Sequence, residues 1–477
     1  MNHSETSSPW RHRWLALVGL WLVGCASGPR VPDLGRLYDR LAQDHSSDRN
    51  PVVVIPGLLG SNLVDAASGT TVWGAFGGDY ANPNEPEGAR LVALPMRRGD
   101  RLDELVDRVR ENGALESIEV RVLGLPIGVN AYFQILMALG AIGGYRDAAI
   151  DSVDYGDDHF TCFQFAYDWR RDISESAARL HEFLVDEREA VTREYERRGM
   201  PADDVRFDVV AHSMGGLVLR YFLRYGSATL PDDGSLPELT WAGAELVERA
   251  ILVGTPNAGS MVAFEELLTG TKIGPFTPRY RPAIVGTMPA AYQLLPRSRH
   301  GAWATTTGQR FESIYDVATW ERNGWGLFDE SESACIEFLL PDVPEAIERR
   351  AITRDHVGKC LRRAEQLHRA LDVPATPPDG TELFLAVGDA TDTKATAFLD
   401  ATDGSVVRYE CEAGDGTVLR SSALGDERVG GEFRPRLVSP IGWERVMFFF
   451  DDHLGLTQSA AFIDNLLFTL LEEPRRE

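Results

Sequence analysis

Short apolar runs alternate with longer amphipathic stretches along most of the chain. Five apolar runs have the length of buried strands, and they cover residues 51–55, 160–167, 207–211, 250–254 and 381–387. Helical spacing of apolar residues marks the stretches 131–139, 173–198, 214 to about 224, and about 457–471. Strands that alternate with helical crossovers predict an α/β fold, with a mostly parallel central sheet and helices on both faces.

Two stretches break this alternation. Residues 65–100 are rich in Gly, Asn and Pro, which predicts a loop. Residues 270–380 mix Pro, Arg and Trp with several short helical segments, as an insertion would. A chain of 477 residues is long enough for one large domain of this kind. We therefore expect a sheet domain in two parts, 51–269 and 381–477, with an insertion at 270–380.

The first 24 residues have the pattern of a signal peptide. Arg11 and Arg13 precede an apolar run that ends at Gly24 and is too short for a transmembrane helix, which needs roughly 20 residues. The run leads into Leu-Val-Gly-Cys, which resembles a bacterial lipobox in which Cys25 is acylated and becomes the new N-terminus. Residues 25–50 are polar and aperiodic, so we expect a lipid-anchored tether. Ala26 resembles the residue that follows the cysteine in lipoproteins sorted outward, which predicts anchoring in the bacterial cell envelope, at the periplasmic or surface face of the outer membrane.

The charge balance limits the partners. The formal net charge is −24, so phosphates would repel the chain, and neither nucleic-acid binding nor electrostatic adsorption to anionic lipid is expected. Contact with a membrane is then expected to depend on the N-terminal lipid anchor, which holds stably when it carries two or more acyl chains. The sequence predicts neither protein partners nor an oligomeric state.

Four cysteines follow Cys25 in the chain. Outside the cytoplasm they could form disulfides, and three full pairings are possible. Cys335 and Cys360 lie in the same insertion and could staple it, whereas Cys162 lies in an apolar run and is expected to be a buried thiol. No pairing is assigned to Cys411. No spacing of Cys and His resembles a zinc site, and neither a metal nor an organic cofactor is expected.

The segment from Ala211 to Gly216, Ala-His-Ser-Met-Gly-Gly, follows a predicted strand and opens a predicted helix. That context is the one a nucleophile elbow requires, because the serine hydroxyl must stand clear of the sheet on a sharp turn. Ala211 replaces the first glycine usual in such turns. The backbone N–H of Met214, at the helix start, is free to hold the oxyanion of a tetrahedral intermediate. Ser213 could instead be an ordinary helix cap, but we interpret it as the nucleophile of a serine hydrolase.

A serine nucleophile on such a sheet takes its acid and its histidine from later in the chain. His453 lies just before the final predicted helix and is the candidate base, whereas His356 and His368 fall in the insertion and are expected at the solvated surface. Two acids compete for the third position. Asp389 follows a predicted strand directly, while Asp415 has a glycine on each side that would let its carboxylate approach a ring closely. Local chemistry favours Asp415, although an Asp-Gly turn would also explain it.

Five motifs together resemble the lecithin:cholesterol acyltransferase family, which includes lysosomal phospholipase A2. In chain order they are Pro56-Gly57-Leu58-Leu59-Gly60-Ser61, Tyr167-Asp168-Trp169-Arg170, Ala211-His212-Ser213-Met214-Gly215, Gly254-Thr255-Pro256 and Gly414-Asp415-Gly416-Thr417-Val418. The likeness spans roughly residues 51–470. It implies an α/β-hydrolase fold with a cap or lid, which the insertion at 270–380 would form. It also implies the transfer of acyl groups from phospholipids to an alcohol or to water.

Carried over by position, the resemblance implies a catalytic triad of Ser213, Asp415 and His453. It favours Asp415 over Asp389, and it makes the backbone N–H of Leu58 the second oxyanion donor beside that of Met214.

The resemblance also implies secondary roles. The Tyr167–Arg170 motif is expected to support a strand end. Ala291–Pro296, in the insertion, is expected either to line an acyl tunnel or to belong to the core. Animal members have a disulfide-closed, membrane-touching loop after the first strand, but the matching stretch from Val64 to Met96 has no cysteine. The lipid on Cys25 is expected to take over that contact.

The sequence thus predicts a serine-dependent lipid acyl hydrolase or O-acyltransferase. Its substrate would be a (phospho)lipid ester, and its intermediate an acyl-enzyme on Ser213. A carboxylesterase or triacylglycerol lipase that uses only water has the same triad, and a non-catalytic lipid-binding lipoprotein could have the same fold.

Overall fold

The computed structural model describes residues 31–44, 46, 48–76, 80–114, 117–122, 125–130, 132–147, 161–272, 277–308 and 314–475. The predicted signal peptide, its lipobox and Cys25 lie outside these residues. No helix in the described part of the chain is long and apolar enough to cross a membrane.

Six parallel strands form the central sheet. Their spatial order is β15 (Arg445–Phe449), β12 (Glu382–Gly388), β10 (Val247–Val253), β9 (Phe207–His212), β1 (Val52–Ile55) and β8 (Cys162–Gln164). All residues of β1 and β9 are buried, which explains why these strands are continuous apolar runs in the sequence. The first strand, β1, lies between two later strands, and this crossover brings the loops after β1 and β9 side by side at the carboxyl edge of the sheet.

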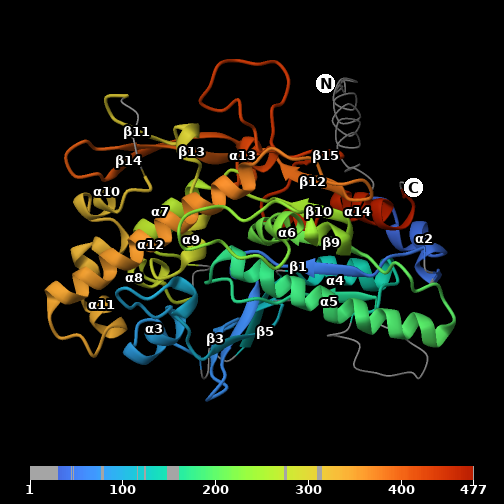
Figure 1. Cartoon of the computed structure of the whole chain (residues 1–477), viewed down its shortest axis with the longest axis horizontal. Coiled ribbons are helices and arrows are strands. Elements are labelled where there is room, and N and C mark those ends of the chain that lie inside the picture. The colour runs from blue at the N-terminus through green and yellow to red at the C-terminus, as the bar shows by residue number, and fades with distance from the viewer. Residues whose placement is uncertain are drawn as a thin grey trace, which may run out of the picture.

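Helices cover both faces of this sheet. α5 (Ile173–Arg198) packs against α6 (Met214–Tyr225), which contacts β1, β9 and β10 (Figure 1). At the edge strand, Phe449 packs against Phe462 of α14 (Ala460–Leu471), whereas Phe448 lies beneath the guanidinium of Arg420 in α13 (Arg420–Leu424). Because neighbouring side chains of a strand point to opposite faces, α13 and α14 lie on opposite sides of β15. The architecture is that of an α/β-hydrolase, as predicted.

The sequence locates the ends of α5 correctly. The side chain of Asp172 accepts a hydrogen bond from the backbone N–H of Ser174 at the first turn, and Gly199 ends the helix in the left-handed conformation, at φ 68°. The helix predicted at 131–139 is a short α4 (Phe133–Met137) that continues as the π-helical turn η3 (Ala138–Ile142).

The expected tether is wrong for residues 31–50. They form α2 (Leu34–Tyr38) and the turn η1 (Leu41–Gln43), which pack on the domain. Leu34 and Tyr38 are buried, and the Tyr38 hydroxyl donates to Asp464 of α14 at 2.9 Å. The Arg49 guanidinium lies 3.6 Å from the centre of the Tyr145 ring. One apolar helical turn holds this segment, and a signal that short does not stand out in a polar sequence.

The loop expected at 65–100 contains short elements of regular structure that its sequence does not predict. A small antiparallel sheet consists of β2 (Ser61–Asp65), β3 (Thr71–Trp73) and β5 (Val109–Ala114), and α3 (Pro86–Val92) and the turn η2 (Leu102–Glu104) complete the segment. Trp73 is buried against Trp169 with ring centroids 5.3 Å apart, and its indole N–H donates to the carbonyl of Leu59 at 2.8 Å. A second small sheet comprises β4 (Ala75–Phe76), β6 (Ser117–Val122) and β7 (Leu125–Asn130).

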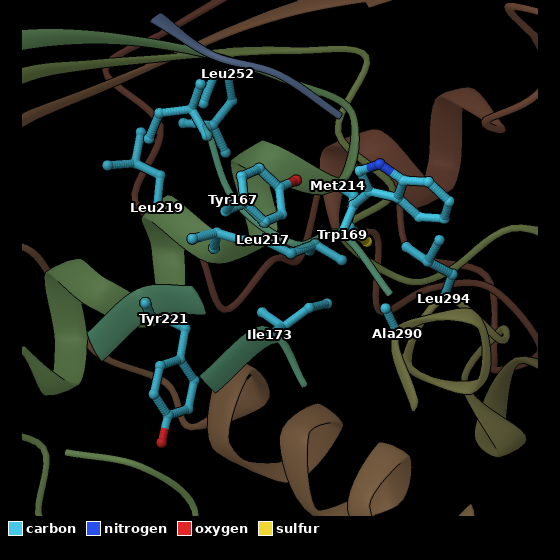
Figure 2. Packing of buried hydrophobic residues seen from close by; sticks show 14 of the residues in the cluster. Tyr167, Trp169, Ile173, Met214, Leu217, Leu219, Tyr221, Leu252, Ala290 and Leu294 are labelled. Carbon is cyan, nitrogen blue, oxygen red and sulfur yellow. The ribbon is translucent and has the colours of Figure 1, made fainter. Parts of the chain in front are cut away.

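The insertion packs firmly on the sheet domain. After η4 (Ala242–Leu246) and α7 (Met261–Thr269), it contains α8 (Pro282–Val285), α9 (Pro289–Gln293), η5 (Ser298–His300), β11 (Trp303–Thr305), α10 (Val317–Arg322), η6 (Gly326–Phe328), η7 (Glu330–Glu332), α11 (Ser333–Leu339) and α12 (Ala346–Asp372). The sequence predicts only short helical pieces here, whereas α12 has 27 residues. Figure 2 shows side chains of this insertion in one apolar cluster with those of α5, α6 and β10: Ala290, Leu294, Ile173, Met214, Leu217 and Leu252.

Three expectations for the insertion need correction. His356 and His368 are buried, and each ring bonds a backbone carbonyl at 2.9 Å, that of Thr287 and of Gln293 respectively. Cys335 and Cys360 form no disulfide with each other. Both histidines are on the buried face of the unpredicted helix α12, which explains why they looked like surface residues in the sequence.

Of the two roles expected for Ala291–Pro296, the structure shows burial in the core. Tyr292 and Leu295 have no exposed surface, and the Tyr292 hydroxyl donates to the carbonyl of Gly286.

An antiparallel hairpin follows β12 directly. Its strands are β13 (Thr391–Leu399) and β14 (Val406–Gly414), and β11 of the insertion adds to the β13 side. Thr391 pairs with Gly414, so the chain leaves the central sheet and returns to the place it left. The final turn η8 (Gly455–Thr457) precedes α14.

Candidate active site

Ser213 lies on a sharp turn between β9 and α6. Its φ of 53° is in the positive region that side-chain-bearing residues rarely adopt. Gly215 and Gly216 permit this turn, because a Cβ on Gly215 would lie 2.4 Å from the Pro56 carbonyl oxygen and one on Gly216 only 1.9 Å from Oγ1 of Thr255. A strained serine between a strand and a helix, with tightly packed small residues after it, has the geometry of a nucleophile elbow.

His453 connects Ser213 to Asp415. Its Nε2 lies 2.9 Å from Oγ of Ser213, and its Nδ1 lies 2.8 Å from Oδ2 of Asp415. The His453 backbone N–H also donates to the Asp415 carbonyl at 2.9 Å, which fixes the ring's loop to the carboxylate's loop. The structure thus brings Ser213 together with Asp415 and His453, which lie more than 200 positions later in the sequence.

Asp415 is buried and remains a strong acceptor. Burial alone would raise its pKa, but the adjacent His453 and the backbone N–H groups of Val418 and Thr417 hold the pKa of this carboxyl below its ordinary value. Those two amides donate to Oδ1 at 2.7 and 2.9 Å, which leaves Oδ2 for His453. An ionised carboxylate in this position fixes the imidazole tautomer that carries its proton on Nδ1.

The competing acid, Asp389, has another partner. Its carboxylate lies 3.6 Å from Nε of Arg420. The two acids occupy the same end of the sheet, because a Cβ on Gly388 would lie 2.7 Å from the Cβ of Asp415. The β13–β14 hairpin separates them in sequence and then delivers Asp415 to the edge that Asp389 also borders.

The turn after β10 packs directly against Asp415 and His453. A Cβ on Gly254 would be 3.2 Å from Nδ1 of His453 and 3.3 Å from Oδ2 of Asp415. Farther along this turn, the Ser260 hydroxyl donates to the Thr417 carbonyl at 2.5 Å, and the Asn257 amide donates to that of Ala423 at 2.7 Å. The Gly254-Thr255-Pro256 motif therefore supports the Asp415 loop, a role that sequence reasoning did not assign.

The turn after β1 borders the serine from the other side. A Cβ on Gly57 would lie 2.8 Å from the Cβ of Ser213 and 3.3 Å from its Oγ. Leu58 follows Gly57, and Met214 follows Ser213, so the two amides expected as oxyanion donors are on the segments that flank the hydroxyl. Met214 is the first residue of α6, where backbone N–H groups have no partner within the helix.

The Tyr167–Arg170 motif holds this turn in place. The Tyr167 hydroxyl donates to the Pro56 carbonyl at 2.9 Å, and the Trp169 indole donates to that of Ser61 at 3.2 Å. Arg170 is fully buried and bonds both oxygens of Asp168 and the carbonyls of Leu91 and Val92. These contacts anchor the strand end and the turn after β1.

Tyr132 is a neighbour of the site that sequence reasoning missed. Its hydroxyl accepts a hydrogen bond from the Gly57 N–H at 2.8 Å and lies 2.9 Å from Nδ1 of His212. The residues around it carry no recognisable motif, so only the folded chain reveals it. Among the described residues, no group of three or more His, Cys, Asp or Glu side chains has the arrangement of a metal site.

Comparisons with known proteins find one family model and several solved structures that are similar to this chain. Residues 128–323 match the sequence model of the lecithin:cholesterol acyltransferase family, which confirms the resemblance. No curated protein matches the chain. One similar solved structure, the Tle4–Tli4 complex, has a TM-score of 0.51 at 15% identity, with 88% of this chain and 98% of the other covered, and it shows a common fold.

Two further solved structures are EstA from Clostridium botulinum and lipase 1 from Pelosinus fermentans. Their TM-scores are 0.35 and 0.32, at 12% and 13% identity. The match with EstA covers 94% of this chain and 100% of EstA. The match with the Pelosinus lipase covers 89% of this chain and 99% of that lipase.

Proposed function

We propose that this protein, an α/β-hydrolase similar to the lecithin:cholesterol acyltransferase family, is a serine-dependent lipid acyl hydrolase or O-acyltransferase. It would move an acyl group from a (phospho)lipid ester to Ser213, and from there to an alcohol or to water. One observation carries the proposal: the continuous contact from Ser213 Oγ through the His453 ring to the buried Asp415, at 2.9 and 2.8 Å.

The proposed reaction has two steps. His453 Nε2 takes the hydroxyl proton of Ser213 as Oγ attacks the ester carbonyl, and Asp415 stabilises the imidazolium that results. His453 then gives this proton to the leaving alcohol, and the acyl-enzyme remains. In the second step, water or an acceptor alcohol loses its proton to His453 as it attacks the acyl group, and Ser213 recovers its proton.

The negative charge that develops on the ester oxygen needs donors fixed in advance. The amides of Leu58 and Met214 are our candidates, because they flank Ser213 on two rigid segments. The turn carrying Leu58 is held by Tyr167, and α6 is buried along its whole length. Donors that need no rearrangement stabilise the transition state most effectively, and loss of one such donor typically lowers kcat by about 10²–10³-fold.

The lipid character of the substrate rests on the family match over residues 128–323. We also propose that the protein is held at the bacterial outer membrane by acyl chains on Cys25, since the motif there resembles a lipobox. The domain would then work next to its substrate without any electrostatic attraction to the membrane.

A fluorophosphonate probe tests the nucleophile. Full-length protein, extracted from membranes in detergent, should be labelled covalently, and the Ser213→Ala variant should not. Absence of labelling in the folded wild-type protein would overturn the proposed enzyme and would favour a non-catalytic lipid-binding lipoprotein.

Product analysis tests the reaction class. The same preparation is given phosphatidylcholine vesicles that contain a sterol or a fatty alcohol, with Ser213→Ala as the control. A Ser213-dependent acyl ester of the added alcohol identifies an acyltransferase, and free fatty acid alone identifies a phospholipase. Turnover of triglycerides or small esters, but not of phosphatidylcholine, identifies the triacylglycerol lipase or carboxylesterase instead.

A further inference from the structure

A buried hydrogen-bonded bridge connects the turn after β1 to the loop that carries His453. The Gly57 N–H donates to the Tyr132 hydroxyl at 2.8 Å, and this hydroxyl lies 2.9 Å from Nδ1 of His212. The other ring nitrogen of His212, Nε2, lies 3.0 Å from the backbone carbonyl oxygen of His453. The bridge therefore runs through the side chain of His212, the residue directly before Ser213.

The position of every proton in this bridge follows from its partners. The Tyr132 oxygen accepts from Gly57, so its own proton is available for Nδ1 of His212, which must then be an acceptor. Nε2 faces a carbonyl oxygen and must be the donor. A neutral His212 with its proton on Nε2 satisfies all three contacts and also gives the Tyr132 proton an acceptor.

Burial favours the same state. Together with the smaller effect of the neighbouring His453, it lowers the pKa of His212 to about 3. The two imidazole rings are 4.8 Å apart, centre to centre. A charged His212 would oppose the imidazolium that His453 must become during catalysis, so the neutral bridge is compatible with the proposed reaction.

The backbone of His453 is consequently held at both of its polar groups. Its N–H donates to the Asp415 carbonyl, and its carbonyl accepts from His212. The Tyr132 ring also packs against the turn after β1, where a Cβ on Gly60 would lie 2.9 Å from Cε2 of Tyr132.

We propose that Tyr132 and His212 are positioning residues that hold the general base, His453, in place beside Ser213, with the turn after β1 as the fixed end of the bridge. This inference rests on the proposed function and deepens it. Neither residue would touch the substrate. Their effect would be on the geometry from which His453 receives the serine proton and returns it to the leaving alcohol.

The test compares two substrates in purified full-length protein. The leaving group of an alkyl ester is a basic alkoxide, which needs the proton from His453. The leaving group of a p-nitrophenyl ester is a stable anion, which needs that proton far less. We expect Tyr132→Phe to lower kcat/KM for the alkyl ester by roughly 10- to 100-fold, a part of the roughly 10²–10⁴-fold that general acid–base catalysis contributes. The loss for the p-nitrophenyl ester should be several-fold smaller. A purely structural defect would lower both equally.

Tyr225→Phe is the matched control. Its hydroxyl is also buried and donates to a backbone carbonyl, that of Ala370 at 2.8 Å, at the far end of α6. This variant should keep both kcat/KM values.

Two substitutions of His212 test the hydrogen bonds of its two ring nitrogens separately. A glutamine places an amide N–H near the position of Nε2 and can still donate to the His453 carbonyl, whereas an asparagine reproduces only the Nδ1 side. We expect His212→Gln to retain more alkyl-ester activity than His212→Asn.

Equal losses on both esters in Tyr132→Phe, or kcat/KM unchanged from the wild type, would overturn the positioning role. Equal activities of His212→Gln and His212→Asn would do the same. If instead the wild-type protein turns over neither ester and takes no fluorophosphonate label, the proposed function fails, and that result is distinct from a failure of the bridge.

Discussion

Gly254 offers a sharp test of how the site is packed. At its φ of +56°, an alanine costs about 1–2 kcal/mol of folding free energy, because a Cβ crowds the backbone in the left-handed region. The new methyl would also lie 3.2 Å from Nδ1 of His453 and 3.3 Å from Oδ2 of Asp415, closer than such atoms normally approach. The histidine and the carboxylate would each have to move by a few tenths of an ångström.

Small displacements of reacting groups are costly in rate, and about 1 Å can cost 10²-fold. We therefore expect Gly254→Ala to lower kcat/KM by roughly 10- to 100-fold. This loss is smaller than the roughly 10⁴-fold expected when the carboxylate itself is replaced by an amide. The assay is hydrolysis of a p-nitrophenyl ester, with folding stability measured in parallel by urea unfolding.

Gly199→Ala separates the two effects. Gly199 has a φ of +68°, but no atom lies within 4 Å of the position its Cβ would take. The variant should lose about 1–2 kcal/mol of stability as Gly254→Ala does, and keep its activity. Wild-type kcat/KM in Gly254→Ala, or an equal loss of activity in Gly199→Ala, would refute the proposed packing.

Three other predictions test the remaining assignments. Asp415→Asn should reduce turnover by about 10⁴-fold in esterase assays, and Asp389→Asn should leave it nearly unchanged; the reverse order would show that the acid is misassigned. Burial lowers the pKa of both His300 and His356 to about 4, so the stability gained from their neutral forms is present above the unfolded-state pKa near 6.5 and is lost as the pH falls toward 4. The urea midpoint should therefore fall between pH 7.5 and 4.5, less steeply in His356→Gln, and a constant midpoint would contradict this reasoning. Metabolic labelling with a fatty acid should disappear in Cys25→Ala, since persistent label would place the acyl chain elsewhere.

The sequence predicts the central sheet well because its signals are local. Four of the five expected strand segments are single apolar runs that coincide with β1, β9, β10 and β12, and the fifth contains the shorter β8. The edge strand β15 was not predicted. It is only half-buried, so it lacks the continuous apolar run that marks a central strand.

The nucleophile and the histidine are recognisable for the same reason, since each has a strong local context. Asp415 is harder, because its role depends on a hairpin that brings it back beside Asp389. The contacts of Tyr132 and Gly254 are beyond any local pattern. They arise between segments that meet only in the folded chain, and the neighbouring residues do not indicate them.

The helix α12 was missed for a different reason. It is rich in Arg, so its average hydropathy is low, although a mainly apolar stripe from Ile352 to Leu371 is buried. The two histidines on that stripe were consequently expected at the surface.

The hairpin of β13 and β14 makes part of this enzyme exchangeable. Its two ends face each other at Thr391 and Gly414, so a longer or shorter excursion would leave the acid where it is. The hairpin also provides the strand to which β11 of the insertion attaches. A chimera that exchanges the hairpin together with β11 would have to keep the contacts at the end near Asp415, where the Gly416 N–H donates to Oγ1 of Thr393 at 2.8 Å. Variation in such a scaffold can change the far end of the hairpin while the residues next to Asp415 stay the same.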